Sequence, residues 1–303
     1  AWGVENEVDY FAISFVQNAK DMKNARKLLN GYKGKLIAKI EKFDAVANID
    51  EIIEASDGLM VARGDLGIEV PYYDVPTIQK MLIKKANIKG IPVITATQML
   101  LSMTQNERAT RAEISDVANA VLDGTDVVML SEESAVGNDP INVVDTMHNI
   151  IAKTEDIYNF DKQYKFAYLD EFDVIQATVT KLADDLKANG ILALTSSGKS
   201  AQKMSRYRPR TPIFTFTHKK KVLSSLTAIW GVEPIGTIKE AQASKMFQKM
   251  LKSLDEIGRL KKDGLYVATV GYPVGMPGST NTIKILTPSE IEYYLNFKDK
   301  KSK

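Results

Sequence analysis

The sequence contains no cysteine, and this absence excludes several kinds of chemistry at once. Without thiols there are no disulfides, no thiolate nucleophiles and no zinc–thiolate centres. Only two histidines, His148 and His218, occur among the 303 residues, so catalysis would rest mainly on Lys, Asp, Glu and Thr. The lack of cysteine also agrees with a cytoplasmic location, where thiols stay reduced.

An excess of charge of one sign is missing too. The 40 basic and 38 acidic residues give a net charge of +2, and the one basic cluster of note is a lysine triplet at 219–221. Nucleic-acid and membrane-surface partners both need a concentrated basic field. No apolar run approaches a membrane span, and the first ten residues contain no apolar signal segment. We therefore expect a globular protein with neither nucleic acid nor membrane as a partner.

Short apolar runs alternate with helical patterns in the first half of the chain. The predicted strands are residues 10–16, 36–40, 59–62, 93–96 and 127–130. The predicted helices are residues 20–29, 46–55, 75–87, 111–122 and 140–158. Near-continuous apolar strands that alternate with amphipathic helices indicate a parallel sheet covered by helices.

Polar side chains stand at the end of each predicted strand. They are Ser14, Lys39 with Glu41, Arg63 with Asp65, Thr97 with Gln98, and Ser131 with Glu133. A (β/α)8 barrel gathers all of its strand ends together, whereas an open sheet gathers only those beside its switch point. The pattern favours a partial TIM-type barrel of five β/α units over a doubly wound sheet.

The second half predicts a smaller open α/β sheet after a linker at 159–172. Its expected strands are residues 191–194, 212–217, 232–235, 265–270 and 282–286. Its expected helices are residues 174–187, a short one ending at 207, 222–230 and 241–257. We therefore expect two domains, a partial catalytic barrel over 1–160 and a regulatory α/β domain over 173–303.

Lys39 and Glu41 are two residues apart on a predicted strand, so both side chains leave the same face. Leu36, Ala38 and Ile40 would then face the covering helices. A cation and a carboxylate that point into one pocket suit an enzyme that binds a charged substrate with the help of a metal ion. A simple ion pair is the alternative.

Asp65 lies in a glycine-containing turn, Ala62-Arg63-Gly64-Asp65-Leu66-Gly67, directly after a predicted strand. Glycines let backbone N–H groups approach an anion. Asp65 would supply a hard oxygen ligand alongside Glu41, which suits Mg²⁺. The alternative is an ordinary turn in which the aspartate caps a helix.

A serine-rich loop in the second half is a candidate phosphate site. Thr195-Ser196-Ser197-Gly198-Lys199-Ser200 lies between a predicted strand and a predicted helix. Hydroxyls, backbone donors and the helix N-terminus together would form a nest for a phosphate. A helix cap that is rich in serine by chance is the alternative.

Several of these motifs resemble those of pyruvate kinases and occur in the same order. They are Lys39-Ile40-Glu41, Met60-Val61-Ala62-Arg63-Gly64-Asp65-Leu66-Gly67, Ala96-Thr97-Gln98-Met99-Leu100, Thr110-Arg111-Ala112-Glu113 and Asp116-Val117-Ala118-Asn119-Ala120-Val121-Leu122-Asp123-Gly124. The resemblance is specific from about residue 9 to residue 139 and resumes weakly in the second half. It implies the C-terminal portion of such an enzyme, with the later barrel strands and the effector domain.

The resemblance implies phosphoryl transfer from phosphoenolpyruvate to ADP, giving pyruvate and ATP in the last step of glycolysis. Lys39 would neutralise the phosphoryl group in flight and the enolate behind it. Glu41 and Asp65 would hold Mg²⁺ or Mn²⁺, and backbone groups from Ala62 to Asp65, including Arg63 and Gly64, would grip the substrate carboxylate.

Two hydroxyl residues complete the site that the resemblance implies. Thr97 would lie beside the carbon that must be protonated, within a water-linked proton path. An ordinary strand threonine is the alternative for Thr97. Ser14 resembles a substrate-side position.

The resemblance also implies partners and regulation. Thr195–Ser200 would bind the phosphate of an effector, residues 271–278 would form the loop facing it, and the protein would be a homotetramer. A requirement for K⁺ stays open, because the family's monovalent-cation ligands precede the first strand of this chain. One departure is Ser131-Glu132-Glu133-Ser134, which stands where the family usually has Ser-Gly-Glu-Thr. Glu132 thus adds a carboxylate to a loop that should approach the nucleotide.

Two other functions stay open. One is a phosphometabolite-binding regulatory module without catalysis, and the other is a metal-dependent lyase acting on a 2-oxo acid. With five of eight barrel units, the chain alone is expected to be inactive and to associate through its open sheet edges.

Overall fold

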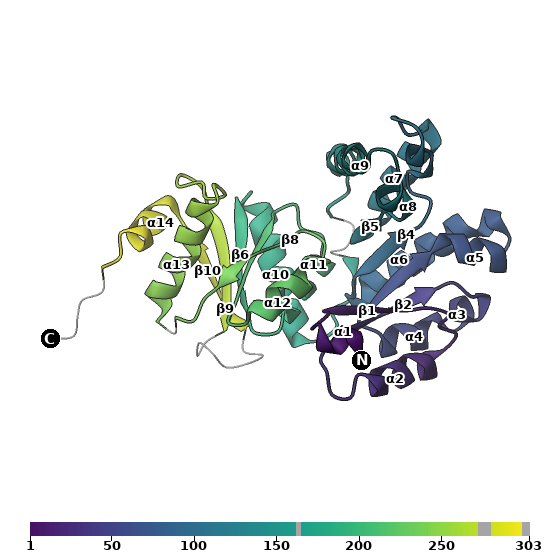
Figure 1. Cartoon of the computed structure of the whole chain (residues 1–303). Helices are drawn as coiled ribbons and strands as arrows, with labels where there is room; N and C mark the ends of the chain where they lie inside the picture. The colour runs from purple at the N-terminus through teal and green to yellow at the C-terminus, as the bar shows by residue number, and fades with distance from the viewer. Residues whose placement is uncertain (162–164, 241, 272–279, 299–303) are drawn as a thin grey trace. The chain divides into compact units, whose positions relative to one another are not determined.

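The computed structural model describes residues 1–161, 165–240, 242–271 and 280–298. The chain divides into two compact units, Ala1–Asn159 and Phe160–Lys303. Each unit is built around a five-stranded sheet of its own (Figure 1). Among the described residues, no helix combines the length and the apolar character that crossing a membrane requires.

The first sheet is entirely parallel and follows the order of the chain. Its strands are β1 (Tyr10–Ile13), β2 (Lys35–Ile40), β3 (Gly58–Ala62), β4 (Val93–Ala96) and β5 (Val127–Met129). They pair as β1-β2-β3-β4-β5 without a reversal, so β1 and β5 are the edges of this sheet within the described residues. A sequential parallel order is that of a (β/α) barrel, which confirms the predicted fold class.

Helices connect these strands and cover the outer face of the sheet. They are α1 (Trp2–Glu5), α2 (Ala19–Leu28), α3 (Phe43–Ala47), α4 (Ile49–Ala55), α5 (Arg63–Glu69), α6 (Val75–Lys89), α7 (Arg111–Asp123), α8 (Glu132–Ala135) and α9 (Pro140–Glu155), with 3-10 turns η1 (Tyr72–Asp74) and η2 (Leu101–Thr104). Leu36, Ala38 and Ile40 are buried with Ile52 of α4 and Leu82 of α6, as the strand period predicted. The residues between them on β2 therefore face the opposite side of the sheet.

The first unit departs from the predicted elements in several places, including the short helices α1 and α8, which were not predicted. β1 ends at Ile13 rather than at residue 16, because Phe15 has a left-handed backbone with φ of +58°. The helix predicted over 46–55 is two helices, α3 and α4, which meet at Asn48. A helix that was not predicted, α5, begins at Arg63 directly after β3, so the glycine-containing turn is helical.

The second sheet is open and doubly wound. Its strands are β6 (Gly190–Thr195), β7 (Ile213–Thr217), β8 (Val232–Thr237), β9 (Tyr266–Gly271) and β10 (Thr280–Leu286), in the order β10-β9-β6-β7-β8. Its helices are α10 (Glu171–Asp185), α11 (Lys199–Arg206), α12 (Lys220–Leu226), α13 (Ala243–Glu256) and α14 (Pro288–Leu295), the last of which was not predicted. β10 is antiparallel to β9, and the other pairs are parallel. The strand order reverses between β6 and β9, which makes their C-terminal ends the switch point of the sheet.

Part of the predicted linker packs onto this second unit. Arg206 of α11 and Asp173 of α10 are fully buried and form an ion pair of 2.8 Å. The other terminal nitrogen of Arg206 donates to the carbonyl of Ala167 at 2.8 Å. The hydroxyl of Tyr207 donates to Asp173, and burial together with this carboxylate raises the pKa of Tyr207. The charged network thus ties residue 167 to α10 and α11.

Candidate active site

Three of the predicted residues meet at the C-terminal ends of β1 and β2. The ammonium group of Lys39 donates to Ser14 Oγ at 3.0 Å and lies 2.6 Å from Glu41 Oε1. The other carboxylate oxygen of Glu41 accepts from the backbone N–H of Phe15 at 2.7 Å. The strand period predicted the Lys39–Glu41 pair, and parallel pairing of the two strands adds Ser14.

The Glu41 carboxylate is buried and the ammonium beside it is not. Glu41 is 1% exposed, whereas Lys39 is 24% exposed. A buried charge must keep its partners, and both oxygens of Glu41 have one here. Each of these oxygens still has a free lone pair, since a carboxylate offers about four acceptor sites. The ammonium group of Lys39 can therefore contact a ligand that arrives from solvent, while the buried Glu41 carboxylate keeps the ammonium group in position.

Phe15 also belongs to this cluster, although no motif in the sequence includes it. Its backbone is left-handed, its N–H donates to Glu41, and the residue is 64% exposed. The ammonium group of Lys42 lies 6.0 Å from the ring centroid. No sequence signal marks a phenylalanine for a positive φ, so this position was not predictable.

A second cluster lies at the ends of β3 and β4. The hydroxyl of Thr97 accepts from the Gly64 N–H at 2.9 Å and donates to the Ala96 carbonyl at 2.6 Å. β3 and β4 pair in a register that sets Ala62 beside Ala96, which brings these two loops together. Thr97 is the first residue after β4, with φ of +71°, so it is not an ordinary strand threonine.

Asp65 stands apart from both clusters. It is exposed in the first turn of α5, and its carboxylate makes no hydrogen bond or ion pair with another described residue. Glu41 and Asp65 follow neighbouring strands, and both offer the hard oxygen donors that Mg²⁺ binds. The described part of the chain contains no group of three or more His, Asp or Glu side chains that could hold a metal. Other oxygens, from water or substrate, would have to complete such a site.

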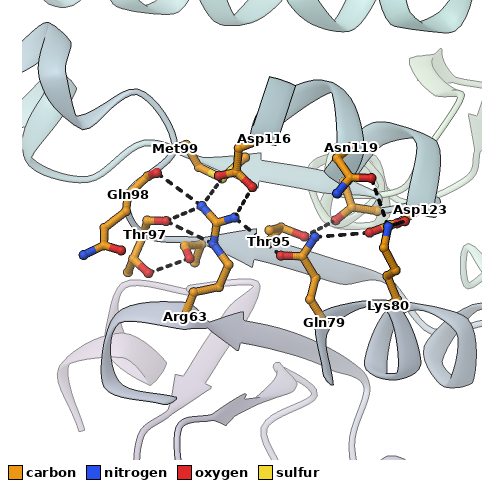
Figure 2. A network of polar contacts seen from close by, with 12 residues as sticks. Arg63, Gln79, Lys80, Thr95, Thr97, Gln98, Met99, Asp116, Asn119 and Asp123 are labelled. Carbon is orange, nitrogen blue, oxygen red and sulfur yellow. Dashed lines mark hydrogen bonds and ion pairs between the residues drawn. The ribbon is translucent and has the colours of Figure 1, made fainter. Parts of the chain in front are cut away.

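The side chain of Arg63 forms all of its hydrogen bonds with residues of the first unit (Figure 2). Its partners are Thr97, Gln98, Met99, Gln79 and Asp116. All three guanidinium nitrogens are used, which leaves only the backbone of Arg63 for a substrate. No local sequence pattern predicts these contacts.

The loop that departs from the family pattern begins α8. Glu132 is exposed, and Glu133 is fully buried with one oxygen accepting from the Ser131 N–H at 2.6 Å. The additional carboxylate at 132 thus points to solvent, while the glutamate that matches the family pattern is held inside.

The predicted phosphate loop lies at the switch point of the second sheet, directly after β6. Thr195 Oγ1 accepts from the Gly198 N–H at 3.0 Å. Gly198 has φ of +85°, and a Cβ there would lie 3.0 Å from Leu226, so glycine suits this turn. Thr195 and Ser200 are buried, whereas Ser197 and Lys199 are exposed. Residues 272–278 of the loop expected to face it lie outside the described residues.

These features define a class, a (β/α)-barrel protein with charged and hydroxyl groups at the C-terminal strand ends, joined to a doubly wound α/β unit. Comparison with known proteins supplies the family. Residues 1–144 match the barrel domain of pyruvate kinase, and residues 173–286 match the alpha/beta domain of pyruvate kinase. The chain belongs to the pyruvate kinase family.

Pyruvate kinases from several bacteria align with nearly the whole of this chain. The pyruvate kinase of Geobacillus stearothermophilus is 44% identical over 297 residues, which are 96% of this chain and 51% of that protein. That of Clostridium acetobutylicum is 43% identical over 291 residues, 94% of this chain and 62% of that protein. That of Lactobacillus delbrueckii subsp. bulgaricus is 42% identical over 293 residues, 94% and 50% respectively. The chain thus spans about half the length of most of these relatives.

Proposed function

We propose that this chain carries part of the active site of a pyruvate kinase, which transfers the phosphoryl group of phosphoenolpyruvate to ADP. The observation that carries the proposal is the cluster at the C-terminal strand ends, where Ser14 and Glu41 each lie within 3.0 Å of the ammonium group of Lys39. Active sites of barrel enzymes lie on this face. Phosphoryl transfer consists mainly of positioning and charge neutralisation, which this cluster can provide.

Lys39 would neutralise the charge on the transferring phosphoryl group and on the enolate left behind. Its position is fixed by Glu41 and Ser14, and a preorganised charge costs no reorganisation during the reaction. Its partial exposure leaves the ammonium group reachable from solvent. Ser14 would donate or accept a hydrogen bond on the substrate side of the ammonium group.

Glu41 and Asp65 are the residues that would hold a divalent ion, Mg²⁺ or Mn²⁺. Such an ion would neutralise the charge on substrate oxygens. Glu41 is held by the Phe15 N–H and by Lys39, so its orientation does not depend on the ion. The carboxylate of the substrate would meet the backbone between Ala62 and Asp65.

Thr97 would stand beside the carbon that receives a proton. Its hydroxyl lies between the Gly64 N–H and the Ala96 carbonyl, so a small rotation could transfer its hydrogen bond to a water or the substrate. We also propose that Thr195–Ser200 binds the phosphate of an effector, because ligands of doubly wound sheets bind at the switch point. The cytoplasmic location and the homo-oligomeric state expected of the family remain part of this proposal.

A lactate-dehydrogenase-coupled assay with phosphoenolpyruvate and ADP tests the activity. It is run on this chain and on a chimera that adds the part of the Geobacillus relative which the chain does not cover. We expect ADP-dependent turnover by the chimera, and its loss in Lys39→Met. Turnover without ADP would favour a lyase, and binding of phosphometabolites without turnover would favour a regulatory module; either result would overturn the proposal.

A further inference from the structure

We propose that Arg63, the first residue of α5, is a positioning residue, which fixes the Thr97 hydroxyl by holding the backbone carbonyl groups of Thr97 and Gln98. The role of that hydroxyl in proton transfer rests on the proposed function. The position of the hydroxyl does not, because it follows from contacts within this chain alone.

The guanidinium group of Arg63 joins four segments of the first unit (Figure 2). Its acceptors are the carbonyl oxygens of Thr97 at 2.7 Å and Gln98 at 3.3 Å, the sulfur of Met99 at 2.9 Å, Gln79 Oε1 at 3.4 Å and Asp116 Oδ1 at 2.7 Å. The side chain is 9% exposed, so water has little access to replace these contacts. An arginine presents its five N–H groups in one rigid plane, which a lysine cannot reproduce.

The turn that Arg63 holds is one that its residues would not adopt unaided. Thr97 and Gln98 have consecutive positive φ angles of +71° and +55°. A β-branched residue strongly avoids this region, and such conformations persist only when their surroundings impose them. Both carbonyl groups of the turn point to the same guanidinium, and hydrogen bonds from a charged donor are about twice as strong as neutral ones. We assign the stability of the turn to these bonds.

Asp116 orients the guanidinium from the opposite side. It lies on α7 and accepts from Nη1 of Arg63, and its carboxylate makes no hydrogen bond with Thr97 or Gly64. The hydrogen bonds thus connect Asp116 to Thr97 through Arg63. This arrangement separates an effect of positioning from a direct effect on the turn.

The Gly64 amide reports where the Thr97 hydroxyl lies, because it donates to that hydroxyl at 2.9 Å. Its hydrogen exchange needs no substrate and no catalysis. In the full chain, we expect Arg63→Lys to speed this exchange about tenfold or more, the scale of losing hydrogen bonds to a charged group. Asp116→Asn should speed it about threefold or more, since an amide oxygen still accepts but without charge.

Arg26→Lys is the matched control. Arg26 also pairs with an aspartate, Asp57, and donates to the Gly34 carbonyl at 2.6 Å, but these partners precede β2 and β3 and so lie at the N-terminal end of the sheet. Its variant should leave Gly64 exchange unchanged. Equal exchange at Gly64 in Arg63→Lys, Asp116→Asn and the control would overturn the assignment.

A second measurement tests the consequence for catalysis in the chimera described above. Arg63→Lys should lower the kcat for exchange of the pyruvate methyl protons with solvent about tenfold, while the KM for pyruvate in the same assay changes less than about threefold. A rise in KM alone would contradict a positioning role. If the unmodified chimera lacks pyruvate kinase activity, the proposed function fails, and Gly64 exchange alone decides the role of Arg63.

Discussion

Replacing Lys39 with methionine separates a catalytic lysine from a structural ion pair. Methionine keeps much of the apolar stem and removes the charge that Ser14 and Glu41 contact at 3.0 and 2.6 Å. Loss of one preorganised charge stabiliser lowers catalysis by about 10²–10³-fold, or roughly 3–4 kcal/mol of transition-state stabilisation. We expect phosphoryl transfer by the chimera to fall by that factor.

The same change also affects stability, and this effect must be measured separately. Glu41 is 1% exposed and would keep only the Phe15 N–H as a partner. Hydrogen bonds to charged groups contribute about 1.5–3 kcal/mol, and partial exposure of the ammonium group points to the lower end of that range. Urea unfolding of Lys39→Met should therefore show a loss of about 1–2 kcal/mol.

A double variant, Lys39→Met with Glu41→Gln, tests the reasoning. A neutral amide no longer needs a buried cation, so the double variant should regain most of the lost stability. It should not regain turnover, because neither the ammonium nor the metal-binding carboxylate is present. Recovery of turnover together with stability would refute the catalytic role, and Lys39 would then be only the partner of Glu41.

Three further predictions follow from the structure. Asp173→Asn should lower the free energy of unfolding by about 3–5 kcal/mol because it leaves Arg206 buried without its charge partner, whereas Asp170→Asn, which loses a surface ion pair with Lys203, should cost about 1 kcal/mol or less in the same urea titration. Saturating sugar phosphate, at about a hundredfold excess over its dissociation constant, should stabilise the second unit by about 2.7 kcal/mol, and Ser197→Glu but not the exposed Thr178→Glu should abolish the thermal shift. Burial opposes ionisation of Glu113, but hydrogen bonds from Ser102 and Thr110 hold its pKa below the usual 4.5. Its contribution to stability is therefore present above pH 4.5 and is lost as the pH falls through the lower pKa of the folded state. Glu113→Gln should flatten the acid side of a plot of unfolding free energy against pH, and an unchanged plot would contradict this.

The strands and the Lys39–Glu41 pair were predictable because they depend on local patterns. The alternation of Leu36, Ala38 and Ile40 with Lys39 fixes which face of β2 carries the charge, since side chains alternate strictly along a strand. The order of five strand-helix units gives a parallel sheet with its ends on one side. Lys39 and Glu41 therefore had to lie together, and 2.6 Å separates their charged atoms.

The rest of the candidate site depends on contacts between residues far apart in the sequence, which no local pattern encodes. Arg63 and Asp116 are 53 residues apart, and nothing near either one indicates the other. The positive φ angles of Phe15 and Thr97 oppose the preferences of these residue types, so tertiary contacts impose them. Sequence reasoning fails where the structure departs from local preference, and both departures lie at the candidate site.

The metal position tests the central proposal most directly. A crystal of this chain soaked with Mn²⁺ and phosphoenolpyruvate should give an anomalous difference peak within bonding distance, about 2.0–2.2 Å, of oxygens of both Glu41 and Asp65. Glu41→Gln should remove that peak and Asp50→Asn, a change at an exposed carboxylate paired with Lys85, should leave it in place. An ion bound elsewhere, or held by only one of the two carboxylates, would contradict the proposed site.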